Sequence, residues 1–168
     1  VILVVTKMIY TKLINSIDKP DKKSVHVTNG KIGTTLVSII RTHIGGPHTA
    51  MVVEALKRCN IKRIIRFDIC GSISDEIPLG SLIAVKSSLL LDGTCKDYLE
   101  AYASSLVSNK LISKTNDDYV CGCDESMLAN VESLKSSIQS DLIKPVICEK
   151  SVSTDSLFLE TETKIREW

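Results

Sequence analysis

The first 58 residues alternate between short apolar runs and helical patterns. Val1–Val5 is wholly apolar and rich in β-branched residues, as expected of a strand buried on both faces of a parallel sheet. Apolar residues recur at helical spacing over Met8–Ile17, and Asp18–Asp21 is expected to end this helix in a turn. The order of strand, helix and turn predicts the start of an α/β domain.

A hairpin and a second helix are predicted next. Ser24–Thr28 and Thr35–Arg41 are predicted antiparallel strands that flank Asn29-Gly30, the strongest short signal for a hairpin turn. Gly45-Gly46-Pro47 then leads into a predicted helix over Thr49–Arg58, with Pro47 at its start. The apolar residues of this helix share one face: Ala50, Val52, Val53 and Leu56.

The pattern weakens in the second half of the chain. Ser81–Val85 and Pro145–Val152 are predicted buried strands, and Met127–Ile138 is a predicted amphipathic helix capped by Asp124. Residues 92–123 are rich in Asp, Ser, Asn and Lys, and we expect a long loop with one helical segment there. The alternation of strands and helices again predicts an α/β fold.

Composition narrows the class of protein without identifying it. The chain has 168 residues, 43% of them hydrophobic and 24% charged, as expected of one globular domain. Its net charge of +1 comes from 21 basic and 20 acidic residues that are interspersed, which argues against a nucleic-acid or membrane partner. Apolar runs are far shorter than the roughly 18 residues of a bilayer span, so we expect a cytoplasmic protein.

The cysteines and histidines do not predict a metal site. Six cysteines are scattered along a chain that can build a core without disulfides, so we expect free thiols. Cys121-Gly122-Cys123 lacks the two-residue spacer of zinc motifs. His43 and His48 lie five residues apart on either side of a turn, so they do not share a helix face. We expect no metal and no cofactor.

Three loops follow predicted strands, where ligands collect in open α/β sheets. Thr42–His48 is either an anion-binding turn or a plain strand-to-helix turn. In Phe67–Ser74, the preceding Arg66 is placed either to bind a phosphate or to pair with Asp68 or Asp75. In Ser151–Phe158, the alternative to a binding loop is that Asp155 caps a final helix.

Taken in order, these loops resemble the nucleoside phosphorylase family, and within it the uridine phosphorylases. "THIGGPHTAMVVEAL" is similar to the segment T-G-I-G-G-P-S-T-S-I-x-x-E-E-L, and "IKRIIRFDICGSI" to the R-x-G-T-x-G strand and loop. "LLLDGTC" resembles L-D-G-x-S, and "STDSLF" resembles S-S-D-T-F-Y. The resemblance runs in register over essentially the whole chain. It implies an α/β fold with three αβα layers and a mixed, partly barrel-like central sheet, formed by residues 1–168 as a single, incomplete domain.

The resemblance also implies an activity and its residues. The reaction is phosphorolysis of a nucleoside to free base and ribose 1-phosphate, with inorganic phosphate as co-substrate and catalysis mainly by placement and charge. Arg66 matches the family's catalytic, phosphate-binding arginine, and Thr6 and Ile69 lie at the other phosphate positions. The positions expected to contact the nucleoside are Cys70, Gly71, Phe158, Glu162 and Lys164. The family assembles as homo-oligomers, which implies a dimer or a hexamer of dimers.

Several positions depart from the family pattern. The family's G-D-P-x-R segment is Thr6-Lys7-Met8-Ile9-Tyr10 here, so a phosphate-binding glycine and arginine are replaced. Asp68 replaces a glycine beside Arg66, and a like charge at about 4 Å from phosphate costs roughly 4 kcal/mol at intermediate dielectric. Glu162 and Lys164 stand where uridine phosphorylases present Gln and Arg, and an ionised glutamate only accepts hydrogen bonds.

These departures leave other functions open. A non-catalytic nucleoside-binding or assembly module, a nucleosidase that uses water, and a purine nucleoside phosphorylase are the alternatives. The chain ends before the family's V-E-M-E segment, whose Met and Glu hold the ribose. We therefore expect a fragment whose ribose contacts lie outside these residues.

Overall fold

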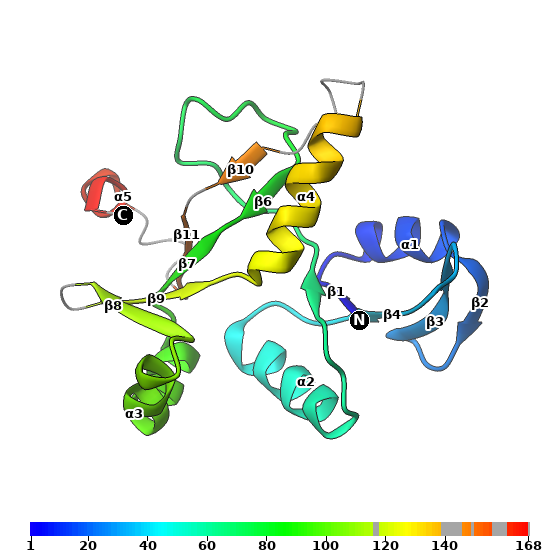
Figure 1. Ribbon diagram of the computed structural model, residues 1–168, viewed down its shortest axis with the longest axis horizontal. Helices are drawn as coiled ribbons and strands as arrows, with labels where there is room; N and C mark the ends of the chain where they lie inside the picture. Colours follow the sequence, from blue (N-terminus) through cyan, green and yellow to red (C-terminus); the bar gives the residue numbers. More distant parts are fainter. Residues whose placement is uncertain (116–117, 139–145, 149, 156–160, 168) are drawn as a thin grey trace. The chain divides into compact units, whose positions relative to one another are not determined.

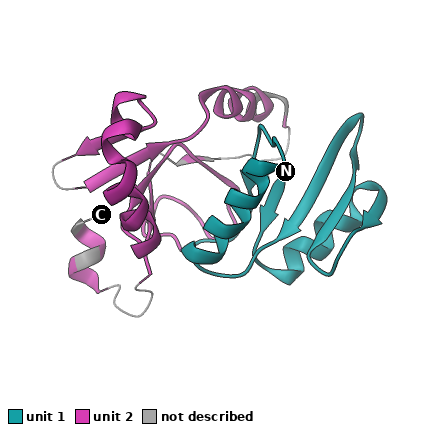
Figure 2. Ribbon diagram, turned by 90° about the horizontal axis from the view of Figure 1, so that it is seen from below, with its two compact units in different colours: residues 1–70 teal, residues 71–168 magenta. Residues whose placement is uncertain are grey.

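The computed structural model describes residues 1–115, 118–138, 146–148, 150–155 and 161–167 (Figure 1). The chain divides into two compact units, residues 1–70 and 71–168, and each is described by itself (Figure 2). In the described residues, no helix combines the length and the apolar character needed to cross a membrane. Of the positions singled out from the sequence, Phe158 and Pro145 lie outside the described residues.

The first unit is built on one mixed sheet with the strand order β2-β3-β4-β1-β5. β1 lies between β4 and β5 and runs parallel to both, whereas β3 lies between β2 and β4 and is antiparallel to both. The strands are β1 (Ile2–Val4), β2 (Asp18–Lys22), β3 (Val27–Ile32), β4 (Thr35–Arg41) and β5 (Ile65–Arg66), and the helices are α1 (Lys7–Asn15) and α2 (Gly46–Arg58).

The core of this unit lies between the sheet and α1. Val4 and Ile39 are fully buried in neighbouring parallel strands, and Tyr10 and Ile17 pack against them. The hydroxyl of Tyr10 hydrogen-bonds that of the buried Thr28 at 2.8 Å, so the one polar atom of this tyrosine is satisfied. The buried apolar strand Ile2–Val4, the parallel pairing and the first helix confirm the sequence prediction.

Two local predictions in this unit are wrong. Asp18–Lys22, expected as a turn, is the edge strand β2, where Pro20 is tolerated because an edge strand leaves some donors unpaired. Asn29-Gly30 lies within β3, and the hairpin turns instead at Gly33-Thr34, where Gly33 has a φ of +58°. Gly30 serves close packing, because a Cβ there would lie 2.6 Å from Ile17 Cδ1 and 3.0 Å from the Asp18 carbonyl oxygen.

The second unit holds two smaller sheets. β6 (Ile83–Val85) pairs in parallel with β10 (Val146–Cys148). The other sheet has the order β11-β7-β9-β8, with β7 (Ser87–Leu90) parallel to β11 (Ser151–Ser153) and antiparallel to β9. The remaining elements are α3 (Gly93–Ser108), β8 (Ile112–Thr115), β9 (Asp118–Gly122), α4 (Glu125–Ser137) and α5 (Glu162–Glu167).

This unit departs most from prediction at residues 92–123. A long loop with one helical segment was expected there; the structure has the helix α3, and the antiparallel pair β8 and β9 takes the place of the loop. The expected strand Pro145–Val152 is two short strands, β10 and β11. The helix capped by Asp124 is confirmed, since the Asp124 side chain accepts a hydrogen bond from the Met127 amide. Mixed open sheets with helices confirm the predicted α/β class.

Candidate functional site

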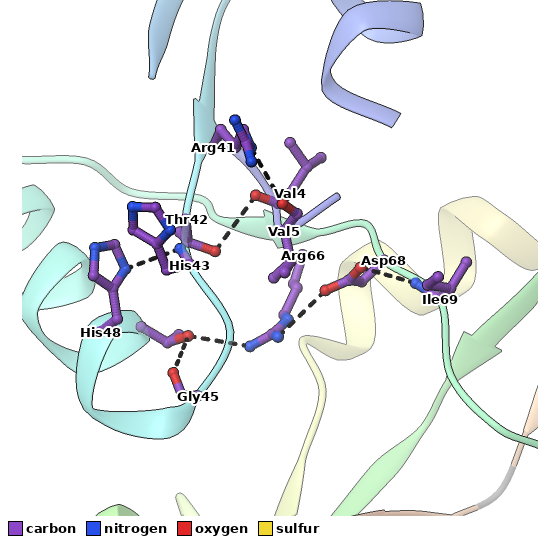
Figure 3. A network of polar contacts seen from close by, with 11 residues as sticks. Val4, Val5, Arg41, Thr42, His43, Gly45, His48, Arg66, Asp68 and Ile69 are labelled. Atoms are coloured by element: carbon purple, nitrogen blue, oxygen red, sulfur yellow. Dashed lines mark hydrogen bonds and ion pairs between the residues drawn. The ribbon is translucent and has the colours of Figure 1, made fainter. Parts of the chain in front are cut away.

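Three parallel strands of the first unit end at the same edge of the sheet. Leu3 of β1 lies opposite Ile40 of β4 and Arg66 of β5, so the residues that follow these strands gather there. They include Thr6 after β1, and Thr42 and Asp68 after the other two strands, which Figure 3 shows near Arg66. Carboxyl edges of parallel strands are where ligands bind in open α/β sheets. This edge is the candidate site.

Arg66 is the most exposed charge of this network, and two neighbours hold its guanidinium. Nη1 donates to Thr49 Oγ1 at 3.3 Å, and Nη2 lies 3.3 Å from Asp68 Oδ2 (Figure 3). The Arg66 side chain is 49% exposed, so about half of its surface is open to solvent. The pairing with Asp68 is the one anticipated as the alternative to phosphate binding.

Asp68 uses both of its carboxylate oxygens. Oδ2 faces Arg66, and Oδ1 accepts a hydrogen bond from the Ile69 amide at 3.0 Å. Its side chain is 18% exposed, so it is the more buried partner of the pair. The Ile69 amide, which lies at an expected phosphate position, is therefore already bonded to an anion.

The turn before α2 supports Arg66 from the opposite side. Gly45 caps the helix with a φ of +108°, a value that strongly favours glycine, and Pro47 lies in the first turn as predicted. The Gly45 carbonyl oxygen accepts from the Thr49 hydroxyl at 3.1 Å and from the Thr49 amide at 3.2 Å. The turn thus orients the hydroxyl that binds Arg66.

Thr6 presents an unsatisfied hydroxyl at the start of α1. Within the described residues, its Oγ1 is buried without a hydrogen-bond partner, and the side chain makes no capping bond to the helix. The first turn of α1 contains no acidic residue. A buried orphan hydroxyl costs free energy unless a ligand or water satisfies it, and a helix N-terminus favours an anion.

Sequence reasoning missed Arg41 at this edge and included Thr42 only as the first residue of the loop Thr42–His48. Arg41 is the last residue of β4, and its Nε donates a hydrogen bond to the Val5 carbonyl oxygen at 3.4 Å. The nearly buried Thr42 bonds the Val4 carbonyl oxygen through its amide at 2.7 Å. The strand Thr35–Arg41 was predicted, so the place of Arg41 at its carboxyl end was the available signal.

The three histidines of the chain lie in ring contact beside this edge. His43 is edge-on to His26 and to His48, with ring centroids 5.3 and 4.8 Å apart. The His43 amide donates to His48 Nδ1 at 3.1 Å, which fixes that nitrogen as an acceptor. Over the described ranges, no three His, Cys, Asp or Glu side chains are arranged to hold a metal ion.

The remaining predicted site residues are not gathered by the described structure. Cys70 and Gly71 are exposed at the boundary of the two units. Glu162 is exposed and pairs with Arg166 one turn along α5, and Lys164 belongs to the same helix. Phe158 lies outside the described residues.

The second unit contains a separate pair of acids at the start of α3. Asp92 caps the helix through the Cys95 amide at 2.9 Å and accepts from the Ser153 hydroxyl at 2.9 Å. Asp155 Oδ2 accepts from the Gly93 amide at 2.7 Å, so the Asp155 side chain caps the start of α3. Asp92 is 4% exposed.

This environment shifts the pKa of two groups. Burial acts to raise the pKa of Asp92, but hydrogen bonds from Cys95 and Ser153 outweigh it and hold the pKa below its usual range. Burial, a hydrogen bond to Asp92 and its negative charge raise the pKa of the Cys95 thiol to about 12. Burial also raises the pKa of Cys121. These thiols are therefore poor nucleophiles at neutral pH.

Solved structures share this fold. A uridine phosphorylase from Vibrio fischeri aligns with a TM-score of 0.77 at 22% identity, over 99% of this chain and 64% of that one. A 5'-methylthioadenosine/S-adenosylhomocysteine nucleosidase from S. pneumoniae aligns with a TM-score of 0.69 at 18% identity, over 98% of this chain and 67% of that one. At these identities the likeness concerns the fold.

Sequence relatives match a shorter segment. A uridine phosphorylase from Thermococcus kodakarensis is 37% identical over 70 residues, which are 42% of this chain and 25% of that protein. The chain thus matches about a quarter of this curated relative's length. The family model described as Phosphorylase superfamily matches residues 7–168, which is nearly all of the chain. The protein therefore belongs to the phosphorylase superfamily.

Proposed function

We propose that the protein catalyses phosphorolysis of a nucleoside, with uridine as the favoured substrate. The observation that carries the proposal is Arg66, a half-exposed guanidinium at the carboxyl edge where β1, β4 and β5 end. An arginine with open donors suits a phosphate oxygen pair. The uridine phosphorylases among the relatives support uridine as the substrate class.

In this reaction a phosphate oxygen attacks the anomeric carbon of the nucleoside. The C–O bond forms as the glycosidic C–N bond breaks, and the products are ribose 1-phosphate and the free base, which takes up a proton. The sugar becomes cationic and the base anionic in the transition state, so placement of phosphate supplies most of the catalysis. Arg66 is proposed to hold and orient that phosphate.

Thr6 and the Ile69 amide are proposed as further phosphate contacts. The unpartnered Thr6 hydroxyl and the acid-free first turn of α1 support the first assignment. Lys7 adds a positive charge beside Thr6 in the chain. The fit is incomplete at Ile69, since Asp68 already occupies this amide.

The base side of the site remains a proposal drawn from the family resemblance. Cys70, Gly71 and Phe158 would line the base pocket, with Glu162 and Lys164 at the base edge. Glu162 is engaged by Arg166, and its carboxylate only accepts hydrogen bonds, whereas the uracil edge presents both donors and acceptors. A purine base is the second candidate for this reason.

We further propose a cytoplasmic homo-oligomer, a dimer or a hexamer of dimers, that needs no cofactor beyond inorganic phosphate. The second candidate function is hydrolysis by water, as in a nucleosidase. The ion pair of Arg66 with Asp68 favours this alternative, because it reduces the positive charge available to phosphate. A nucleosidase also shares the fold.

The test is base release from the full-length protein given uridine or inosine, with and without phosphate. We expect release that saturates with phosphate and is lost in Arg66→Ala. Arg58→Ala is the matched control, since Arg58 is an exposed arginine at the end of α2. Release that is equal without phosphate would instead support hydrolysis, and no release from either nucleoside would support a non-catalytic module.

A further inference from the structure

Asp68 holds the two donors that an anion at this edge would use. One oxygen faces Arg66 Nη2 at 3.3 Å, and the other accepts from the Ile69 amide at 3.0 Å. A carboxylate and a phosphate bind such donors in the same way, through two negatively charged oxygens. Asp68 thus stands in the structure as an internal anion.

We propose that Asp68 is a specificity-determining residue that competes with phosphate for Arg66. The inference rests on the proposed function, since it concerns the same site, and it adds a residue that limits the anionic co-substrate. It implies that phosphate binds weakly to the wild-type protein. Removing the charge of Asp68, and not any change at Arg66, should strengthen that binding.

Geometry gives two routes for phosphate, and both are unfavourable. A phosphate oxygen would lie about 2.8 Å from Nη2, which itself lies 3.3 Å from Asp68 Oδ2. The two anionic oxygens would then be no more than about 6 Å apart, where like charges repel. The other route displaces Asp68, and it breaks the ion pair and the hydrogen bond from Ile69.

The surroundings keep Asp68 in this position. Its side chain is only 18% exposed, and a bond to the neighbouring amide closes a tight local ring. Thr49 holds the other side of the guanidinium, and Gly45 in turn holds Thr49. Other hydrogen bonds therefore hold both the carboxylate and the guanidinium of this ion pair in position, unlike an ion pair between two freely rotating surface side chains.

The experiment measures binding of inorganic phosphate alone by titration calorimetry, and then steady-state kinetics, on the full-length protein. Asp68→Asn keeps the oxygen that accepts from Ile69 and removes the charge, and Asp68→Gly removes the whole side chain. Asp75→Asn is the control, because it removes a charge from an exposed acid of the following loop. Thermal melting verifies that each variant is folded.

We expect Asp68→Asn and Asp68→Gly to bind phosphate roughly tenfold more tightly than wild type. The KM for phosphate should fall by the same factor, with the KM for nucleoside within about twofold, and Asp75→Asn should match wild type. The gain should vanish in the double variant Arg66→Ala/Asp68→Asn, because the two residues act on one site.

The outcomes separate this inference from the proposed function. Tighter phosphate binding in Asp68→Asn without any turnover supports the competition and contradicts phosphorolysis. Turnover that depends on phosphate, with a phosphate KM that Asp68→Asn leaves unchanged or raises, supports phosphorolysis and overturns the competition. A gain that persists without Arg66, or that Asp75→Asn shares, also overturns it.

Discussion

Asp68 in the first unit and Asp92 in the second are both acids that follow a strand, yet they have different partners. Asp92 is 4% exposed, and its described contacts are neutral donors at the start of α3 and the Ser153 hydroxyl. Asp68 faces a half-exposed arginine and one loop amide. A buried carboxylate that accepts hydrogen bonds from the first turn of a helix stabilises the fold. A carboxylate that pairs with a solvent-exposed arginine instead changes which anions that arginine can bind.

The comparison also explains why position in the chain does not reveal the role of an acid. Asp155 resembles Asp68 in lying within a loop expected to bind ligand, but it caps α3 through the Gly93 amide.

The largest effect is expected at Arg66. Arg66→Ala should lower kcat/KM for phosphorolysis about 10²- to 10³-fold, because it removes the charge that places phosphate in the transition state. Arg66→Lys should recover only part of the loss, since an ammonium lacks the planar fork. The measurement is initial rate against phosphate concentration. A loss smaller than about threefold in Arg66→Ala would exclude Arg66 from the site.

Asp92, which caps α3, should contribute more to the stability of the fold than Asp68, which pairs with Arg66. Asp92→Ala should lower the free energy of unfolding by about 1–2 kcal/mol, because it leaves the Cys95 amide and the Ser153 hydroxyl without their acceptor. Asp68→Ala should change it by less than about 0.5 kcal/mol, since its partner can turn to water. Urea unfolding followed by circular dichroism measures both. Equal losses of unfolding free energy in the two variants would contradict the different roles of Asp92 and Asp68.

The lowered pKa of Asp92 gives a pH dependence with a definite sign. A carboxyl whose folded-state pKa is depressed stabilises the fold above its unfolded pKa, and this stability is lost as the pH falls through the folded value. The stability difference between wild type and Asp92→Asn should therefore be constant above about pH 5 and shrink below about pH 4. Unfolding measured across this range tests it. A difference that grows in acid would contradict the lowered pKa.

The smallest effect concerns thiols near the two acids. Cys70 is exposed two residues after Asp68, whereas the pKa of Cys95 beside Asp92 is raised to about 12. At pH 8, iodoacetamide should modify Cys70 before Cys95, because the thiolate is the reacting form. Peptide mass spectrometry reads the order, with the urea-unfolded chain as control. Equal rates in the native protein would show that the Asp92 region is open to solvent.

Elements with a strong local pattern could be predicted from the sequence. The apolar strand Ile2–Val4 and the helices α1, α2 and α4 follow from hydrophobic spacing, and Asp124 was identified as a cap. One helical segment was expected within residues 92–123, but the bounds of α3 were not predicted, because Leu99 is its only buried residue among those described and its apolar face is weak. Gly30 was wrongly predicted to lie in a turn. Its position inside a strand depends on the pairing of β3 with β4 and on close packing against Ile17, and neither contact is visible in the local sequence.

The site was predictable only in part. Arg66 and Asp68 lie two residues apart, so their pairing could be anticipated as an alternative from the sequence. The contributions of Thr49 and Arg41 depend on three strands ending at one edge, which no local pattern encodes. The base-binding positions stay predictions, since Glu162 is engaged by Arg166 on the surface of α5.

The central claim is that phosphate, and not water, attacks the sugar. The most direct measurement is phosphorus NMR of the full-length protein with uridine and inorganic phosphate, together with a count of free base. If phosphate is the nucleophile, we expect one molecule of ribose 1-phosphate for each base released, at a rate that rises with phosphate concentration. Release of base with free ribose and no consumption of phosphate would contradict it.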